Sequence, residues 1–383
     1  MARFPIADFN ELRTPFYFYD LSLLDRTLAE IKRTARDANF KVHYAIKANA
    51  NPGILRRIQA AGLGVDAVSG GEILAATEAG FDGSKIVYAG VGKSDDEIRL
   101  ALDKGIGCFN VESLPELEAI AAIATELGVK APVAFRVNPN IDAHTHEYIT
   151  TGLSENKFGI DLELLPGVLD AASKLDSIRI KGLHFHIGSQ ITENEPFVML
   201  CDTINRLVDE YAAKGIRFDT INVGGGLGID YADPDRHPIP DFETYFKTFR
   251  NHLRLRPDQE VHFELGRSVV AQCGSLITRV LYVKEGLSKR FAIVDAGMTE
   301  LIRPALYNAH HKIENISSPA GEMHHYDVVG PICESSDCFG KDELLPSVRR
   351  GDFLALRSAG AYGEIMASQY NCRPLPMSYF FET

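Results

Sequence analysis

The 383-residue sequence lacks several features that mark particular classes of protein. No stretch approaches the ~20 apolar residues of a membrane-spanning helix, and no apolar segment follows the basic residue near the N-terminus. We therefore expect no membrane span, no secretory signal and a cytoplasmic location. Acidic residues outnumber basic residues by 52 to 40, and the resulting net charge of −12 argues against nucleic acid or an anionic membrane as a partner.

Cysteine is also sparse. The six cysteines are scattered through the chain without the spacing of a disulfide framework, so reduced thiols in a cytoplasm are the simpler interpretation. Cys333 and Cys338 are too far apart in sequence to form half of a CxxC zinc site. The hydrophobic share of 45% is ordinary for a soluble globular enzyme, and the length allows one large domain with a smaller one.

Short β-rich segments alternate with segments of helical periodicity through the first two-thirds of the chain. The β-rich segments are residues 41–47, 64–69, 85–90, 105–111, 132–139, 180–188, 218–225 and 260–266. The intervening stretches, such as Pro52–Ala61 and Leu114–Leu127, repeat apolar residues at three- and four-residue steps. Eight buried parallel strands, each followed by a helix, favour a closed (β/α)8 barrel over an open doubly wound sheet. Periodicity alone leaves both arrangements open.

The pattern changes beyond Ser268. Segments such as SLITRVLYV and DFLALRSAG follow one another without long helical stretches, which predicts a mainly antiparallel β domain. The N-terminal segment PFYFYD (15–20) has no helix before it and joins that sheet in our prediction. We therefore predict an α/β protein with a (β/α)8 barrel at 21–267. Residues 1–20 and 268–383 form a β-sandwich or β-barrel-like domain in this prediction.

Polar and reactive residues gather at the C-terminal ends of the predicted strands, where the active sites of (β/α)8 barrels lie. These residues are Lys47, Asp66, Ser69, Arg136, Asn138, His184, His186, Ser189, Gly224, Gly225, Gly226, Glu264 and Arg267. A lysine at the end of an apolar strand is costly unless it has a function, although a side chain that reaches solvent would also explain Lys47. The number of similarly placed residues favours a functional rim.

Two glycine-rich segments suggest nucleotide binding only superficially. NVGGGLG (222–228) follows the seventh predicted strand, whereas a dinucleotide fingerprint belongs in the first βα unit. Barrels often bind a phosphate group at this position through backbone N–H groups, and an ordinary turn is the alternative. GVGKS (90–94) is not a phosphate-binding Walker loop, because the first glycine of that motif would have to be residue 87, which is valine.

The pair formed by His184 and His186 is the main signal for a metal site. Alternate residues of a strand point to the same side, and metal-dependent barrel hydrolases use such pairs. Catalytic zinc needs three protein ligands, however, and no further histidine ends another predicted strand. The other pairs, including His144 with His146, fall in loops or in the β domain. We therefore predict no metal.

Taken in order, these motifs resemble the fold-type III decarboxylases that depend on pyridoxal 5'-phosphate (PLP), and most closely those acting on meso-2,6-diaminopimelate. The motifs are TPFYFYD (14–20), YAIKAN (44–49), DAVSGGE (66–72), FNVES (109–113), RVNP (136–139), NKFGI (156–160), GLHFHIGSQ (182–190), NVGGGLG, ELGRS (264–268), DAGMTELIRPALY (295–307), GPICESSD (330–337) and GAYGEIMASQYNCRP (360–374). The resemblance implies the barrel with a β domain, PLP as cofactor, and decarboxylation of meso-2,6-diaminopimelate to L-lysine and CO2, the last step of lysine biosynthesis.

The resemblance also implies a role for each site residue. Lys47 carries PLP as a Schiff base, Glu264 pairs with the protonated ring nitrogen, and His186 stacks on the ring. The implied contacts to the cofactor further include Asp66, Arg136, Ser189, Gly225, Gly226, Gly266, Arg267 and Tyr362. Cys333 is the implied proton donor, acting together with Glu334 from the neighbouring subunit of a homodimer.

Recognition of the substrate requires a group that binds its distal carboxylate, and a bidentate guanidinium suits that role. The implied substrate contacts are Arg267, Arg303, Tyr307, Glu334 and Tyr362. Arg303 falls in a predicted loop, where an exposed surface charge is the alternative. Leu265 departs from the family pattern, which usually has proline there, and we expect a modest local change.

Three other functions remain open from sequence. The first is a related decarboxylase for carboxynorspermidine, ornithine or arginine, because a single pocket residue can redirect specificity. The others are a metal-dependent barrel hydrolase and a non-enzymatic homologue that keeps the fold for binding. The presence of both Lys47 and Cys333 argues against the non-enzymatic homologue.

Overall fold

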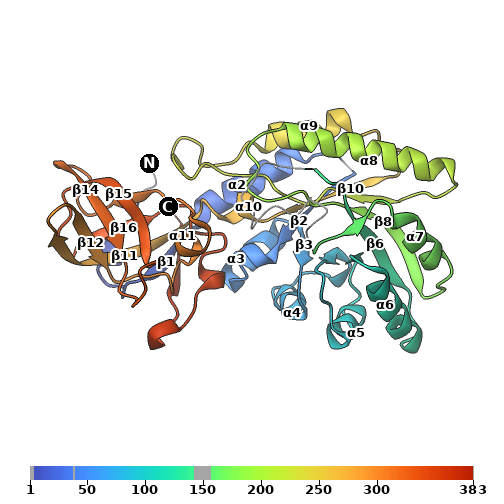
Figure 1. Cartoon of the computed structure of the whole chain (residues 1–383), viewed down its shortest axis with the longest axis horizontal. Coiled ribbons are helices and arrows are strands. Elements are labelled where there is room, and N and C mark those ends of the chain that lie inside the picture. Colours follow the sequence, from blue (N-terminus) through green and yellow to red (C-terminus); the bar gives the residue numbers. More distant parts are fainter. Residues whose placement is uncertain (1–3, 38, 142–156, 383) are drawn as a thin grey trace. The chain divides into compact units, whose positions relative to one another are not determined.

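The computed structural model describes residues 4–37, 39–141 and 157–382. His144, His146 and the first residue of the NKFGI motif lie outside these ranges. The chain divides into two compact units (Figure 1). The first, which we call the barrel unit, is Leu28–Gly228 with Asp241–Gly266, and the second, the β unit, is Met1–Thr27, Ile229–Pro240 and Arg267–Thr383.

Eight parallel strands form a closed barrel in the barrel unit. They are β2 (Phe40–Ala45), β3 (Gly64–Ala67), β4 (Ile86–Tyr88), β5 (Cys108–Val111), β6 (Ala131–Asn138), β8 (Ile178–His184), β9 (Thr220–Asn222) and β10 (Glu260–Leu265). Neighbours follow chain order, and pairing between β10 and β2 closes the ring. The short β7 (Ile160–Asp161) adds only to β6. Each strand overlaps one predicted segment, so the predicted barrel is confirmed and the open sheet is excluded.

Helices alternate with these strands along the chain. They are α2 (Leu21–Thr34), α3 (Pro52–Ala60), α4 (Gly70–Glu78), α5 (Asp95–Asp103), α6 (Leu114–Glu126), α7 (Leu165–Ser173), α8 (Glu195–Ala213) and α9 (Phe242–His252). Three of them begin in the same way, because Ser69, Ser94 and Ser113 each accept a hydrogen bond from the backbone N–H of a glutamate three residues later. Figure 1 shows α4 to α7 on the outer side of the barrel strands.

The β unit contains one eight-stranded, mainly antiparallel sheet. Its strands are β1 (Phe16–Asp20), β11 (Gly274–Glu285), β12 (Arg290–Val294), β13 (Ile313–Asn315), β14 (Met323–Val329), β15 (Cys338–Pro346), β16 (Phe353–Leu356) and β17 (Met377–Phe381). As predicted, the N-terminal segment joins this sheet, where β1 pairs with both β11 and β17. The antiparallel β domain is therefore confirmed as well.

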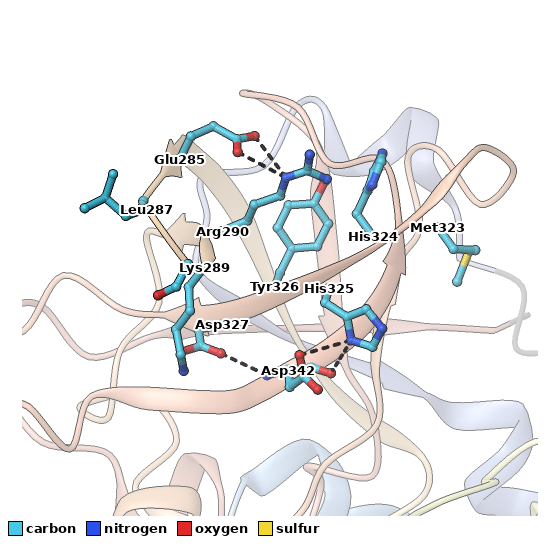
Figure 2. A pocket seen from close by; sticks show the side chains of 12 residues that line it. Glu285, Leu287, Lys289, Arg290, Met323, His324, His325, Tyr326, Asp327 and Asp342 are labelled. Carbon is cyan, nitrogen blue, oxygen red and sulfur yellow. Dashed lines mark hydrogen bonds and ion pairs between the residues drawn. The ribbon is translucent and has the colours of Figure 1, made fainter.

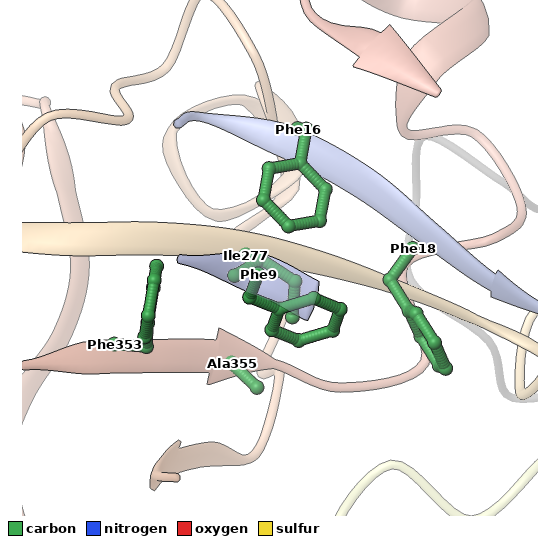
Figure 3. Close-up of a cluster of buried hydrophobic side chains, with 6 residues drawn as sticks. All are labelled: Phe9, Phe16, Phe18, Ile277, Phe353 and Ala355. Atoms are coloured by element: carbon green, nitrogen blue, oxygen red, sulfur yellow. The ribbon is translucent and has the colours of Figure 1, made fainter. Parts of the chain in front are cut away.

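Aromatic packing holds the N-terminal strand onto this sheet. Phe9, which ends the short α1 (Ile6–Phe9), lies edge-on to Phe16 and Phe18 with ring centroids 5.2 and 5.6 Å apart. Figure 3 shows these rings with Ile277 and Phe353, and all of them are buried. Alternate phenylalanines of β1 therefore enter one core, as the spacing of side chains along a strand requires.

The segment 229–240 belongs to the β unit by its contacts, although it lies between barrel strands in sequence. Charged and polar contacts explain this grouping, since Asp235 pairs with Arg357 at 3.0 Å and the Tyr231 hydroxyl accepts a hydrogen bond from Arg303. The predicted domain limits, 21–267 and 1–20 plus 268–383, remain a prediction. Among the helices of the described ranges, none has the length and apolar character that crossing a membrane requires.

Candidate active site

Lys47 lies just beyond the first barrel strand, in the short 3-10 helix η1 (Ile46–Ala48) and not within the strand as predicted. Its Nζ donates a hydrogen bond to Asp66 Oδ2 over 2.8 Å. Asp66 belongs to β3 and is only 1% exposed, whereas the lysine side chain is 39% exposed. Burial, with Glu264 nearby, raises the pKa of Asp66 to about 6, and Lys47 opposes that rise. The structure thus holds an accessible amine against a buried carboxyl group.

Glu264 lies in β10 and is almost fully buried. Its Oε1 accepts hydrogen bonds from the side-chain amides of Asn110 at 3.1 Å and Asn222 at 2.6 Å. Its Oε2 lies 3.0 Å from Nε2 of His184. Burial alone would raise the pKa of Glu264, but the His184 imidazole and the Lys47 ammonium hold it well below its usual range. Glu264 is therefore a carboxylate at neutral pH.

Sequence reasoning identified Glu264 but missed Asn110 and Asn222. Both amides are buried within barrel strands, which is the signal that could have revealed them. A buried polar side chain needs partners, and a residue of this kind within a strand points towards a shared polar site.

The two histidines of the H-x-H pair have different surroundings. β8 ends at His184, whose ring meets Glu264, whereas His186 lies two residues later and its Nδ1 accepts the backbone N–H of Gly225 at 3.3 Å. Burial, followed by the charges of Arg136 and Lys47, lowers the pKa of His186 well below its usual range. His186 is thus a neutral ring at neutral pH. Within the described ranges, no group of three or more His, Cys, Asp or Glu residues is arranged to hold a metal ion.

The glycine turn that follows β9 has no room for side chains. A Cβ on Gly225 would lie 2.0 Å from the carbonyl oxygen of Glu264, and one on Gly224 would lie 2.3 Å from that of Phe185. Gly224 and Gly226 also have positive φ angles of 71° and 111°. Glycine lets a bound group approach the backbone N–H groups closely, as a phosphate site requires.

Arg136 is buried in β6 and pairs with Glu112, whose Oε1 lies 2.9 Å from the guanidinium. The other oxygen of Glu112 accepts the backbone N–H of Gly159. Asp66 and Arg136 therefore have separate charged partners, Lys47 and Glu112. The sequence had not indicated Glu112.

A cluster of cationic and aromatic side chains lies within the β unit. Arg267 and Arg303 donate hydrogen bonds to the same Tyr231 hydroxyl, at 2.6 and 2.9 Å. The guanidinium of Arg267 also lies 4.9 Å from the ring centroid of Tyr362. We predicted a loop at Arg303, but the residue begins the short helix α11 (Arg303–Tyr307) and is only 6% exposed. Its neighbours in sequence gave no helical periodicity because the helix has only five residues.

Arg303 has no ion pair among the described residues. Within the described ranges, its guanidinium hydrogen-bonds to the Tyr231 hydroxyl and, at 3.0 Å, to Nε2 of His311. Burial lowers the pKa of Arg303 from its usual value, and burial lowers that of His311 to about 3. A buried guanidinium next to two neutral partners favours the binding of an anion.

Cys333 and Glu334 are exposed on the β unit, and Tyr307, at the end of α11, is half-buried. The Glu334 carboxylate accepts a hydrogen bond from the Tyr370 hydroxyl at 2.7 Å. The backbone N–H of Cys333 donates to the Asn371 side chain at 3.3 Å. Cys333 is thus a surface thiol and not a buried, inert one.

A groove of about 430 Å³ opens elsewhere on the β unit, between the hairpin of β11 and β12 and the start of β14 (Figure 2). Its charged residues already pair with one another. Lys289 pairs with Asp327 at 2.7 Å, and His325 pairs with Asp342 at 3.1 Å. None of the predicted site residues lines this groove, and we assign no site to it.

The end of the barrel fits PLP by its chemistry. It offers an amine at Lys47, an ionised carboxylate at Glu264 and a glycine turn that a single Cβ would obstruct. Residues 22–271 match the family model described as the pyridoxal-dependent decarboxylase, pyridoxal binding domain. Fold, site and match together define a PLP-dependent decarboxylase.

Curated relatives narrow this class. The chain is 58% identical to diaminopimelate decarboxylase of Bacteroides thetaiotaomicron, over 98% of this chain and 97% of the relative. The enzyme of that name from Vibrio cholerae is 44% identical over 97% of this chain and 88% of the relative. The crystal structure of diaminopimelate decarboxylase from Helicobacter pylori complexed with L-lysine is 42% identical, with a TM-score of 0.93 over 98% of this chain and 94% of that one. The chain belongs to the diaminopimelate decarboxylase family.

Proposed function

We propose that this protein removes CO2 from meso-2,6-diaminopimelate with PLP as its cofactor and releases L-lysine, the last step of lysine biosynthesis. The observation that carries the proposal is an accessible Lys47 amine in the same barrel unit as a buried, ionised Glu264. When bound, PLP supplies an electron sink for the electron pair that remains after CO2 leaves. That sink works best with a protonated ring nitrogen, which an ionised carboxylate favours.

In this proposal each residue that contacts the cofactor has a defined task. Lys47 would hold the cofactor through its side-chain amine, which the substrate amine would displace and set free. Glu264 would pair with the protonated ring nitrogen, and the neutral His186 ring would stack on the cofactor ring. Asp66 and Arg136 lie near the lysine and the ring. The phosphate contacts are Ser189, Gly225, Gly226, Gly266, Arg267 and Tyr362.

Specificity for diaminopimelate depends on the β unit. We propose that Arg267, Arg303 and Tyr307 bind a substrate carboxylate, with Tyr362 as a further contact, and that Glu334 binds an amine. The buried guanidinium of Arg303 has no ion pair among the described residues, which suits an anionic ligand. A substrate without a distal carboxylate, such as ornithine, would leave Arg303 without this anionic partner.

We further propose a homodimer in the cytoplasm, in which Cys333 and Glu334 complete the active site of the neighbouring subunit and Cys333 donates a proton to the substrate carbon. Support comes from exposed apolar side chains between residues 365 and 380, on the C-terminal side of Cys333 and Glu334 in the sequence. These side chains are Ile365, Tyr370, Leu375, Met377 and Phe380. All six cysteines are free thiols, as a reducing compartment allows.

A substrate panel tests the proposal. Release of CO2 is measured from meso-diaminopimelate, ornithine, arginine and carboxynorspermidine, with wild-type protein and with Arg303→Ala. We expect turnover of meso-diaminopimelate alone, and a loss of about 100-fold in kcat/KM in the variant with PLP affinity unchanged, because a buried charge-assisted contact is removed. Lys47→Ala should abolish the visible absorbance of bound PLP. Equal turnover of another substrate, or unchanged absorbance in Lys47→Ala, would refute the corresponding assignment.

A further inference from the structure

Three strands of the barrel each direct one polar side chain at Glu264. Asn110 comes from β5, His184 from β8 and Asn222 from β9, and all three are at most 2% exposed. Their hydrogen bonds to the Glu264 carboxylate are 3.1, 3.0 and 2.6 Å long. None of the three has a role in the function proposed above. We refer to them as the Glu264 cradle.

The cradle occupies most of the acceptor capacity of the carboxylate. An ionised carboxylate has about four lone-pair positions and can only accept hydrogen bonds. Oε1 accepts from both asparagine amides, and Oε2 accepts from His184. The described residues therefore leave one acceptor position, and it lies on Oε2, the oxygen that His184 contacts.

The proton on the His184 ring follows from the same geometry. Because a carboxylate only accepts, Nε2 of His184 must carry a hydrogen. Its other nitrogen, Nδ1, is buried and has no hydrogen-bond partner among the described residues. The contact with Glu264 is therefore the polar interaction that fixes this ring.

Glu264 also differs from three other acidic residues of the barrel unit in its counter-charge. Asp66 pairs with Lys47, Glu112 with Arg136 and Glu116 with Lys93. Within the described ranges, Glu264 has no such contact with a lysine or an arginine, and its direct partners are the cradle residues. Its charge is thus stabilised directly by three N–H donors, and the Lys47 ammonium adds to this electrostatically.

We propose that His184, with Asn110 and Asn222, is a positioning residue that keeps Glu264 ionised and directs the free position of Oε2 at the cofactor ring nitrogen. A single proton lies between the carboxylate and that nitrogen. Each donor to the carboxylate favours the arrangement with the proton on the ring, which the electron sink requires. This inference rests on the proposed use of PLP, but not on the identity of the substrate.

The test measures the ring nitrogen directly. Wild-type protein, His184→Leu and His184→Gln are loaded with ¹⁵N-labelled PLP, and the ¹⁵N NMR shift reports whether the ring nitrogen is protonated. We expect a protonated nitrogen in the wild type, an unprotonated one in His184→Leu, and recovery in His184→Gln, which keeps an N–H donor. The kcat should fall about 100-fold in His184→Leu and recover in part in His184→Gln, with little change in KM.

His43→Leu is the matched control. His43 is another buried histidine on a barrel strand, but its Nε2 lies 3.0 Å from Nδ1 of His262 and not against Glu264. We expect a wild-type ¹⁵N shift in this control. A protonated ring in His184→Leu, or the same change in His43→Leu, would overturn the proposal in favour of simple core packing.

Two further outcomes are distinguishable. If wild-type protein loaded with PLP releases no CO2 from diaminopimelate, the proposed substrate is wrong, and the comparison of ¹⁵N shifts still decides the role of His184. If His184→Leu does not fold, His184→Met replaces it, because its unbranched apolar side chain fills a similar length without a donor. Circular dichroism of each apoprotein establishes folding before loading.

Discussion

Single buried side chains set the electrostatics of the barrel end. Burial dominates for Glu72, which lies in the first turn of α4, and raises its pKa to about 7, although its carboxylate accepts the backbone N–H of Val68 at 2.7 Å. Burial acts in the same direction on Glu264, but there His184 and Lys47 outweigh it. The pKa values of these two glutamates of one barrel therefore shift in opposite directions because their neighbours differ.

Glu72 should make the apoprotein less stable as pH rises. Its pKa is 4.5 unfolded and about 7 folded, so the folded state holds more protons between these values and the stabilisation present below pH 4.5 is lost by pH 7. The shift corresponds to at most about 3 kcal/mol. Glu72→Gln should remove this loss, as measured by urea unfolding of the apoprotein at about pH 5 and about pH 8.

The exposed Glu78 in the same helix provides the control for this experiment. Glu78→Gln changes the net charge equally but should leave the pH dependence of the wild type intact. The same slope in Glu72→Gln as in the wild type would show that another group causes the pH dependence.

The sequence predicted where the reactive residues lie in the chain but not their partners. Lys47 and Glu264 stood out because charged residues at the ends of apolar strands are costly. The contact between Asn110 and Glu264 joins residues 154 positions apart, and it depends on closure of the barrel and on strand register. No local pattern carries that information. The same holds for the pairing of Arg136 with Glu112.

Among the elements, the barrel strands were predictable because parallel strands buried on both faces are nearly continuous apolar segments. The short α11 was not predictable, since five residues are too few to show a helical period. Leu265, in place of the expected proline, ends β10 and keeps its pairing with Tyr44 of β2. The departure therefore leaves this strand intact.

The glycine turn after β9 should tolerate no side chain. Gly225→Ala places a Cβ 2.0 Å from the Glu264 carbonyl oxygen, so the turn or β10 must move. We expect PLP affinity to fall at least about 10-fold and the Tm to decrease, as measured by cofactor titration and thermal unfolding. Gly167→Ala in α7 is the control, because nothing lies within 4 Å of the added Cβ. In this variant the PLP affinity should stay the same, and the Tm should stay the same or rise. Wild-type affinity in Gly225→Ala would argue against this turn as the phosphate site.

At the scale of the whole molecule, a shared active site predicts complementation between inactive subunits. Lys47→Ala and Cys333→Ala should each be inactive, and mixing them in equal amounts should restore roughly a quarter of the wild-type activity. Half of the dimers would then be hybrids, and each hybrid would have one intact site of two. Activity is measured as CO2 release after subunit exchange has been confirmed. No recovery despite exchange would show that each site lies within one subunit.

The β unit is assembled from both ends of the chain. Phe16 to Asp20 of β1 run parallel to Met377 to Phe381 of β17, residue against residue. During synthesis, β1 therefore stays without this neighbour until residues 377–381 of β17 have left the ribosome. A truncation that removes β17 thus acts directly on β1, and the nascent chain exposes an unpaired sheet edge along β1 until β17 has been synthesised.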